Sequence, residues 1–313
     1  MITSTSRKKI RLLHDSNGMR KSISRLVFEI INALILVILA FLCLMPMWHV
    51  LCSSLSDPNW LNSYRGIVWW PHGLNFEGYN LVFENVQLIR GFFNTVLYVV
   101  LHLVIGLALS LTGGYVLAKR DVLWRDPIMF IISFTMLFNG GIVPTFINLR
   151  NLHMIDTIWA VVLPGSLSVM NLILMRTAFQ TVPETLLESA RLDGASEMRI
   201  LWSISIPLIK ATIATVSLYL VIGMWNSWFP AAIYLTDRKL YPMQLILREI
   251  LIVNQDASIS AEAMSSLEGQ DANLYRDLVK YSTIIVSSLP MIILYPFIMK
   301  YFKSGVRVGA IKG

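Results

Sequence analysis

The residues best placed to do chemistry in this 313-residue chain form one polar stretch between long apolar blocks. It reads Glu188-Ser189-Ala190-Arg191-Leu192-Asp193-Gly194-Ala195-Ser196 and continues to Ile204-Ser205-Ile206-Pro207. Thr181, with Glu184 three residues later, predicts a capping box at the start of a helix. Gly194 predicts its end, because glycine accepts the left-handed conformation of a sharp turn. A second short helix is expected from about Ser196, so residues 181–207 predict two helices joined by a turn, which we call the elbow.

The two helices of the elbow are expected to present different faces. Glu188 and Arg191 lie three residues apart and share a polar face. Met198, Leu201 and Trp202 are expected on one apolar face of the second helix. A soluble partner protein can bind such a pair of helices, or the pair can lie flat on lipid headgroups. The chain contains no GxxxxGK[ST] pattern, so we do not expect it to hold nucleotide phosphates itself.

Amide and indole side chains inside the apolar blocks form a second candidate site. Polar groups in hydrocarbon carry a free-energy penalty, so they are functional candidates by default. Sugars are bound by aromatic faces together with amide hydrogen bonds. The candidate substrate-pathway residues are therefore Asn139, Asn171, Trp225, Asn226 and Trp228. The alternative for Trp225 and Trp228 is helix packing or anchoring at the membrane interface.

Histidine and cysteine give weaker signals. His49 and His102 are each alone in an apolar block without an acidic partner at helical spacing, so packing is the favoured interpretation. Cys43 and Cys52 show no CxxC spacing, and we expect neither a metal site nor a disulfide scaffold.

The composition indicates an all-α, polytopic membrane protein. Hydrophobic residues make up 55% of the chain and charged residues only 14%, whereas soluble domains are about one quarter charged. The net charge of +7 does not indicate nucleic-acid binding, because the basic residues flank apolar blocks. The blocks have about the twenty residues needed to cross a bilayer. Six spans are predicted, at about 27–52, 92–117, 127–149, 157–175, 208–235 and 278–301.

The distribution of lysine and arginine predicts the orientation. With both termini in the cytosol, eighteen of the 26 basic residues lie on the inner side. Residues 1–24 then form a basic cytosolic segment, and the first apolar block is long enough to be a retained span rather than a signal peptide. Two long loops, about 53–91 and 236–277, fall outside, and the tryptophans of the first loop either anchor at the interface or dock a partner.

The elbow resembles the EAA motif of ABC-importer permeases, which is written EAA, three residues, G, nine residues, I-x-L-P. This sequence departs from the motif at Ser189 and Ile206. The segments Phe138–Pro144, Trp225–Trp228 and Gly305–Gly313 are similar to the maltose-permease-like, carbohydrate-uptake branch. Within it, the resemblance is to the subgroup for complex polysaccharides and oligosaccharides in Gram-positive bacteria.

The resemblance implies a permease domain over residues 25–313, in a bacterial plasma membrane, with a coupling elbow between spans four and five. Glu188 and Arg191 would present charge to a cytosolic ATPase subunit, and Gly194 would permit the bend. Met198 and Trp202 would hold the elbow against the permease body. The implied coupling residues are Glu188, Ser189, Ala190, Arg191, Asp193, Gly194, Met198 and Pro207.

The resemblance also implies partners. They are a second permease, expected to be a different chain, two ATPase subunits that bind ATP and Mg, and an extracellular solute-binding lipoprotein. The substrate would be an oligosaccharide or polysaccharide fragment, and this chain would be a transport subunit without catalytic residues or a cofactor of its own.

An ion-coupled secondary transporter or a channel subunit is the competing hypothesis. A secondary transporter would need aspartate or glutamate buried within its spans, and often internal repeats. The central parts of the six predicted spans carry essentially no carboxylate, which disfavours that class.

Overall fold

The computed structural model describes residues 23–138, 140–253 and 272–309. Within these ranges the chain is helical with no strand, which confirms the all-α class. The helices in chain order are α2 (Ile23–Ser54), α3 (Pro58–Ser63), α4 (Glu77–Glu84), α5 (Val86–Ala118), α6 (Arg125–Leu137), α7 (Ile142–Asn151), α8 (Ile158–Val162), α9 (Val169–Gln180), α10 (Glu184–Leu192), α11 (Glu197–Ile200), η1 (Leu201–Ser205), α12 (Ile206–Leu208), α13 (Lys210–Trp225), α14 (Phe229–Tyr234), η2 (Arg238–Leu240), α15 (Met243–Arg248), η3 (Glu249–Val253) and α17 (Ala272–Gly309).

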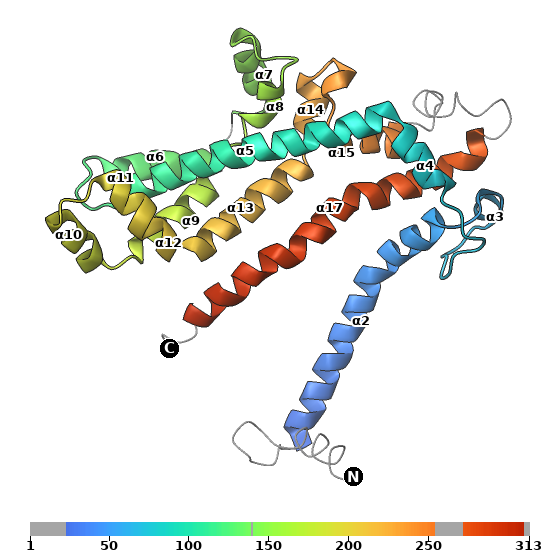
Figure 1. The fold of residues 1–313 in the computed structure, drawn as a ribbon, viewed down its shortest axis with the longest axis horizontal. Helices are drawn as coiled ribbons and strands as arrows, with labels where there is room; N and C mark the ends of the chain where they lie inside the picture. The colour runs from blue at the N-terminus through green and yellow to red at the C-terminus, as the bar shows by residue number, and fades with distance from the viewer. Residues whose placement is uncertain (1–22, 139, 254–271, 310–313) are drawn as a thin grey trace.

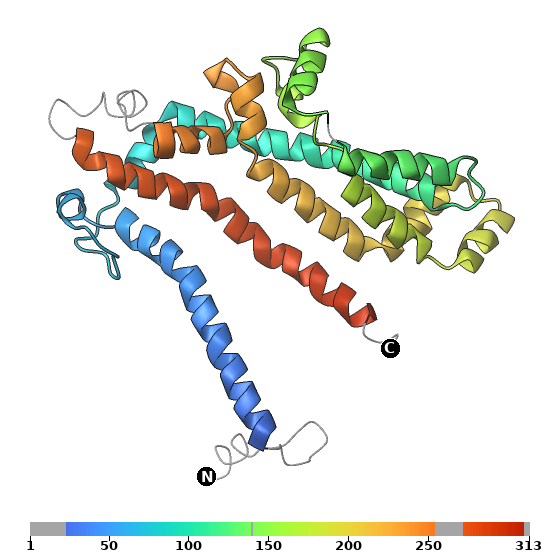
Figure 2. The ribbon, with the colours of Figure 1, turned by 180° about the vertical axis from the view of Figure 1, so that it is seen from behind.

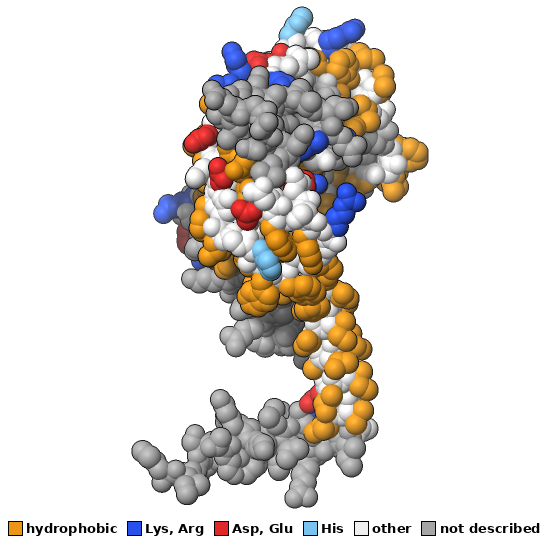
Figure 3. Space-filling view, turned by 90° about the vertical axis from the view of Figure 1, so that its right-hand side faces the viewer, with side chains coloured by type: hydrophobic (Ala, Val, Ile, Leu, Met, Phe, Trp, Pro, Cys, Tyr) orange, Lys and Arg blue, Asp and Glu red, His pale blue; other side chains and the backbone are white. Residues whose placement is uncertain are grey.

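Three helices of the described ranges are long and apolar enough to cross a membrane. They cover Ser24–Ser54, Val86–Ala118 and Tyr275–Pro296, and match the first, second and last predicted spans. Most apolar side chains of α2 between Val27 and Trp48 are exposed (Figure 3), whereas Cys52 near its end is buried. Phe28 and Val37, for example, are each 68% exposed. A helix that is apolar all round and unburied needs a hydrocarbon environment, so the structure supports a polytopic membrane protein.

The three central predicted spans are interrupted in the structure and do not form single helices. In place of the third, α6 and α7 meet at 115°, next to Gly141 with its positive φ of 89°. In place of the fourth, α8 and α9 are separated by a segment containing Pro164-Gly165, which interrupts the helix. The fifth stops at Trp225, and α14 begins separately at Phe229. The described residues supply up to five spans if each bent pair counts as one.

The body of the protein is built around α5. This helix packs against α9 and α13, while α17 runs beside α13 and touches α2 (Figure 1; Figure 2 shows the same arrangement from behind). One core cluster joins Tyr115, Met175, Phe179 and Val216 from these three central helices. The close approach of α5 and α9 depends on Gly114, because a Cβ there would lie 2.7 Å from the Cβ of Met175.

The two predicted external loops contain short helices and touch each other. The first holds α3 and α4, and α5 begins earlier than expected, with the Asn85 side chain capping it by accepting from Gln87 N and Leu88 N. The Asn94 side-chain amide of α5 donates to the carbonyls of Lys239 and Tyr241 in the second loop. The acidic middle of the second loop, near 258–269, lies outside the described residues.

Candidate functional site

The elbow contains the two predicted helices, α10 and α11, but its first cap was predicted wrongly. The Thr181 hydroxyl donates to Ala178 O at 2.7 Å and so closes the preceding helix α9. The N-cap of α10 is Pro183, which offers no side-chain hydrogen bond. The second cap is as expected, because the Ser196 side chain accepts from Arg199 N at the start of α11.

The turn between α10 and α11 is a Schellman motif. Gly194 adopts φ +78°, as its predicted role required. Gly194 N donates to Arg191 O at 3.0 Å, and Ala195 N donates to Ala190 O at 2.9 Å. These two bonds satisfy carbonyls that the end of α10 leaves open. The turn therefore fixes the direction in which the chain leaves α10.

The exposed face of the elbow mixes acidic and apolar side chains. Glu188 and Ser189 are exposed and Ala190 is buried, as the predicted faces require. Met198 and Trp202 were expected to pack against the body, but they are 64% and 62% exposed.

Leu201 does pack against the body, at 4% exposure, together with Ile200 at 0%. Glu197, Leu201 and Ser205 follow one another at intervals of four residues and form the face toward the body. Met198 and Trp202 each come one residue later and therefore point away from it.

The second half of the elbow turns sharply into the next helix. Glu197–Leu208 lies at 85° to α13, with Pro207 in the short α12 just before the bend. The elbow lies at the end of α5 opposite to α3 and α4 (Figure 1).

Glu197 connects the elbow to α5, and the sequence analysis missed it. Its carboxylate accepts from the Tyr115 hydroxyl at 2.6 Å, from Lys119 Nζ at 2.6 Å and from Arg191 Nε at 3.2 Å. The hydrogen bonds from Lys119 and Tyr115 lower the pKa of Glu197 to about 2. The carboxylate is therefore ionised at neutral pH. We call Glu197, Tyr115, Lys119 and Arg191 the Glu197 hub.

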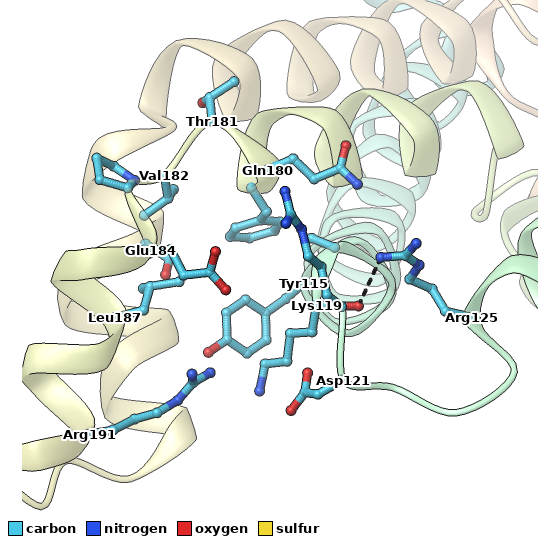
Figure 4. A pocket seen from close by; sticks show the side chains of 15 residues that line it. Tyr115, Lys119, Asp121, Arg125, Gln180, Thr181, Val182, Glu184, Leu187 and Arg191 are labelled. Carbon is cyan, nitrogen blue, oxygen red and sulfur yellow. Dashed lines mark hydrogen bonds between the residues drawn. The ribbon is translucent and has the colours of Figure 1, made fainter.

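The hub borders a cavity of about 710 Å³ between the elbow and the end of α5. Figure 4 shows Tyr115, Lys119 and Arg191 pointing toward one another from α5 and α10. Arg125 donates to Lys119 O and holds the start of α6 against the end of α5. Acidic Asp121 and Glu184 also line the cavity, so its charge is mixed.

The four candidate substrate-pathway residues that the structure describes lie in different surroundings. Asn171 lines a second cavity of about 530 Å³, together with His102 and Ser227. Trp225 is 4% exposed and belongs to a core cluster, which matches the packing alternative. Asn226 donates to Ile222 O one turn earlier.

Trp228 stacks under the guanidinium of Arg248, whose Cζ lies 4.0 Å from the ring centroid. Asn139 lies outside the described residues. Neither histidine faces a carboxylate partner in the described contacts: His102 Nδ1 contacts Val162 O at 3.0 Å, and His49 Nδ1 accepts from Val68 N at 3.0 Å. Both belong to packing contacts, as the favoured interpretation held.

Comparison with known proteins identifies the family to which the chain belongs. Residues 110–308 match the family described as binding-protein-dependent transport system inner membrane component. The chain therefore belongs to this family of membrane permeases.

Two relatives come from Bacillus subtilis strain 168. The polygalacturonan/rhamnogalacturonan transport system permease protein YtcP is 32% identical, over 92% of this chain and 99% of its own. Protein LplC is 30% identical, over 97% and 99%. A solved structure of a bacterial ABC transporter involved in the import of the acidic polysaccharide alginate contains a chain with TM-score 0.83 and 31% identity. That match covers 91% of this chain and 99% of the other.

Proposed function

We propose that this chain is one of two permeases in an ATP-driven importer of oligosaccharides released from complex polysaccharides. The observation that carries the proposal is the elbow of this permease-family chain. Its glycine turn and the exposed Glu188 side of α10 form a surface that a partner can bind. If a partner binds this face of the elbow and changes conformation, the elbow can transmit the movement to α5 and α13. The partners would be a different second permease, two cytosolic ATPases that bind ATP and Mg, and an extracellular binding lipoprotein.

The proposed topology has six spans with both termini in the cytosol. The excess of basic residues on the elbow side supports this orientation. In this arrangement α8 and α9 together form the fourth span, and α13 and α14 the fifth. The joined loops around Asn94 and Tyr241 then face outward, where the lipoprotein would dock.

The substrate class is suggested by the relatives. Both YtcP and the alginate importer are named for polymers of uronic acids, and both match this chain nearly end to end. We therefore propose acidic oligosaccharides as the first substrates to test. Carboxylates on such a substrate would be recognised by arginine or by amide donors along the pathway.

The test begins with purification of the tagged chain from its native host in mild detergent, followed by identification of co-purifying proteins. Recovery of a second permease and an ATPase is expected. The complex is then reconstituted in vesicles, and ATP-dependent uptake of oligogalacturonides is compared with that of neutral maltodextrins. Uptake that needs ATP and the binding protein supports the proposal. Uptake driven by an ion gradient without ATP would support the secondary transporter instead.

A further inference from the structure

The Glu197 hub joins parts of the chain that are far apart in sequence. Glu197 begins α11, Arg191 lies in the last turn of α10, and Tyr115 and Lys119 stand at the end of α5. One carboxylate on the second arm of the elbow thus receives donors from the first arm and from the end of α5. Three donors on one carboxylate leave little freedom for any of the three elements to move alone.

The hub is anchored in the packed core through Tyr115. The Tyr115 side chain is 6% exposed, and its ring meets Phe179 edge to face at 5.4 Å. A buried tyrosine hydroxyl needs a hydrogen-bond partner, and Glu197 provides it. The Lys119 ammonium lies 4.6 Å from the same ring centroid and adds a cation–π contact. The anchor is therefore rigid on the α5 side.

On the elbow side the hub closes the turn. Arg191 reaches across the Gly194 turn to Glu197 at 3.2 Å, so the angle between α10 and α11 is held by a charged pair as well as by the backbone. The Lys119 side chain is 20% exposed and that of Glu197 50% exposed. These values place the hub at the edge of the cavity, where solvent weakens the ion pairs but does not remove them.

We propose that Glu197 is the positioning residue that makes the elbow and the inner end of α5 move as one body. A displacement of the elbow would then reach α5 through Tyr115 and, through the core around Met175, would reach α9 as well. The functional consequence rests on the proposed function, since the displacement is supplied by the ATPase partner. The mechanical connection itself is a property of this chain alone.

The first test measures the connection without any partner. Spin labels at Val116 on α5 and Leu192 on α10, both exposed, report the distance between the two elements in the purified chain, with Cys43 and Cys52 changed to serine. The native hub is expected to give one narrow distance distribution. Glu197→Ala removes all three hydrogen bonds of the hub, so it is expected to raise the population of other distances by more than about tenfold, which is the effect of losing a single charge-assisted hydrogen bond.

Conservative variants separate positioning from a loss of folding. Tyr115→Phe keeps the ring in the core and removes only the hydroxyl donor, so it is expected to broaden the distribution less than Glu197→Ala. The charge exchange Glu197→Lys with Lys119→Glu is expected to restore part of the narrow distribution that each single change loses. Asp121→Asn, at an exposed carboxylate near Lys119, is the matched control and is expected to leave the distribution unchanged.

The second test measures uptake per ATP hydrolysed in the reconstituted complex. Glu197→Ala is expected to assemble and hydrolyse ATP but to lower uptake per ATP severalfold, in step with the broadened distance. An unchanged distance, or a broadened distance with unchanged uptake per ATP, overturns the inference. Failure of the native chain to recruit an ATPase would instead refute the proposed function, and the distance measurement would still decide whether the hub connects the two elements.

Discussion

Replacing Gly194 with alanine isolates the backbone requirement of the elbow turn. Gly194 has φ +78°, and nothing lies within 4 Å of the position that a Cβ would occupy. The substitution therefore creates no clash, and its cost is the left-handed conformation alone, about 1–2 kcal/mol for a residue with a Cβ. That cost raises the equilibrium constant for opening of the turn about 5- to 30-fold. Asparagine tolerates this conformation better, so Gly194→Asn is expected to cost less.

Hydrogen exchange of peptides covering residues 186–200 measures this opening directly. The amides of Gly194 and Ala195 donate within the turn, so they are expected to exchange faster in Gly194→Ala by the stated factor. Gly223→Ala is the matched control, because Gly223 is helical, has an ordinary negative φ and also has nothing within 4 Å of an added Cβ. Equal exchange in Gly194→Ala and the native protein, or an equal increase in Gly223→Ala, would refute the reasoning.

Three further predictions concern other parts of the chain. Gly114→Ala is expected to lower the free energy of unfolding by about 1–3 kcal/mol, because the new Cβ would press on the backbone of α9. Thermal unfolding in detergent measures this loss, and Gly223→Ala is again the control. Glu188→Lys is expected to leave the complex assembled and able to hydrolyse ATP, while uptake falls at least about tenfold, equivalent to ~1.4 kcal/mol. Uptake at the native rate in this variant would show that Glu188 has no coupling role. The backbone amides of Asp237 and Thr236 donate to Asp156 and lower the pKa of its carboxyl. The contact therefore stabilises the folded state fully above the unfolded pKa of about 3.9. This stabilisation is lost as the pH falls through the lower pKa of the folded state. Asp156→Asn should therefore remove the difference in thermal stability between pH 5 and pH 3 that this contact contributes, and an unchanged profile would contradict the assignment.

Local sequence patterns predicted the parts of the fold that local physics determines. The glycine turn at Gly194, the Ser196 cap and the long apolar helices depend on neighbouring residues and on hydrophobic length alone. The interruptions inside the three central spans were not predicted, because hydropathy averages over a window and does not register a Gly-Gly or Pro-Gly break inside it. Thr181 could cap the following helix or close the preceding one, and the sequence does not distinguish these two hydrogen bonds.

The candidate site was predicted less completely, because its decisive contacts are distant in sequence. Glu197 stands 82 residues from Tyr115, and no spacing rule joins them. The one local indication of this contact was that Glu197 follows Arg191 by six residues, on the other side of the predicted turn. The shared face of Met198 and Trp202 was misassigned because apolar character was taken to indicate burial, whereas the face toward the body contains Glu197 and Leu201, one residue earlier in each turn.

The surface chemistry of the elbow distinguishes its two possible neighbours. A helix that rests on lipid headgroups carries its polar face rich in lysine and arginine, which meet anionic lipids. The elbow exposes two glutamates, Glu184 and Glu188, and one arginine outside the Glu197 hub, Arg199, while the Arg191 guanidinium is engaged by Glu197. Its exposed apolar residues include Leu192 at 90%, well beyond what a solvated turn requires. Acidic and apolar groups side by side on a projecting turn fit a protein cleft with basic and hydrophobic walls better than a lipid surface, which is the arrangement that a coupling partner would supply.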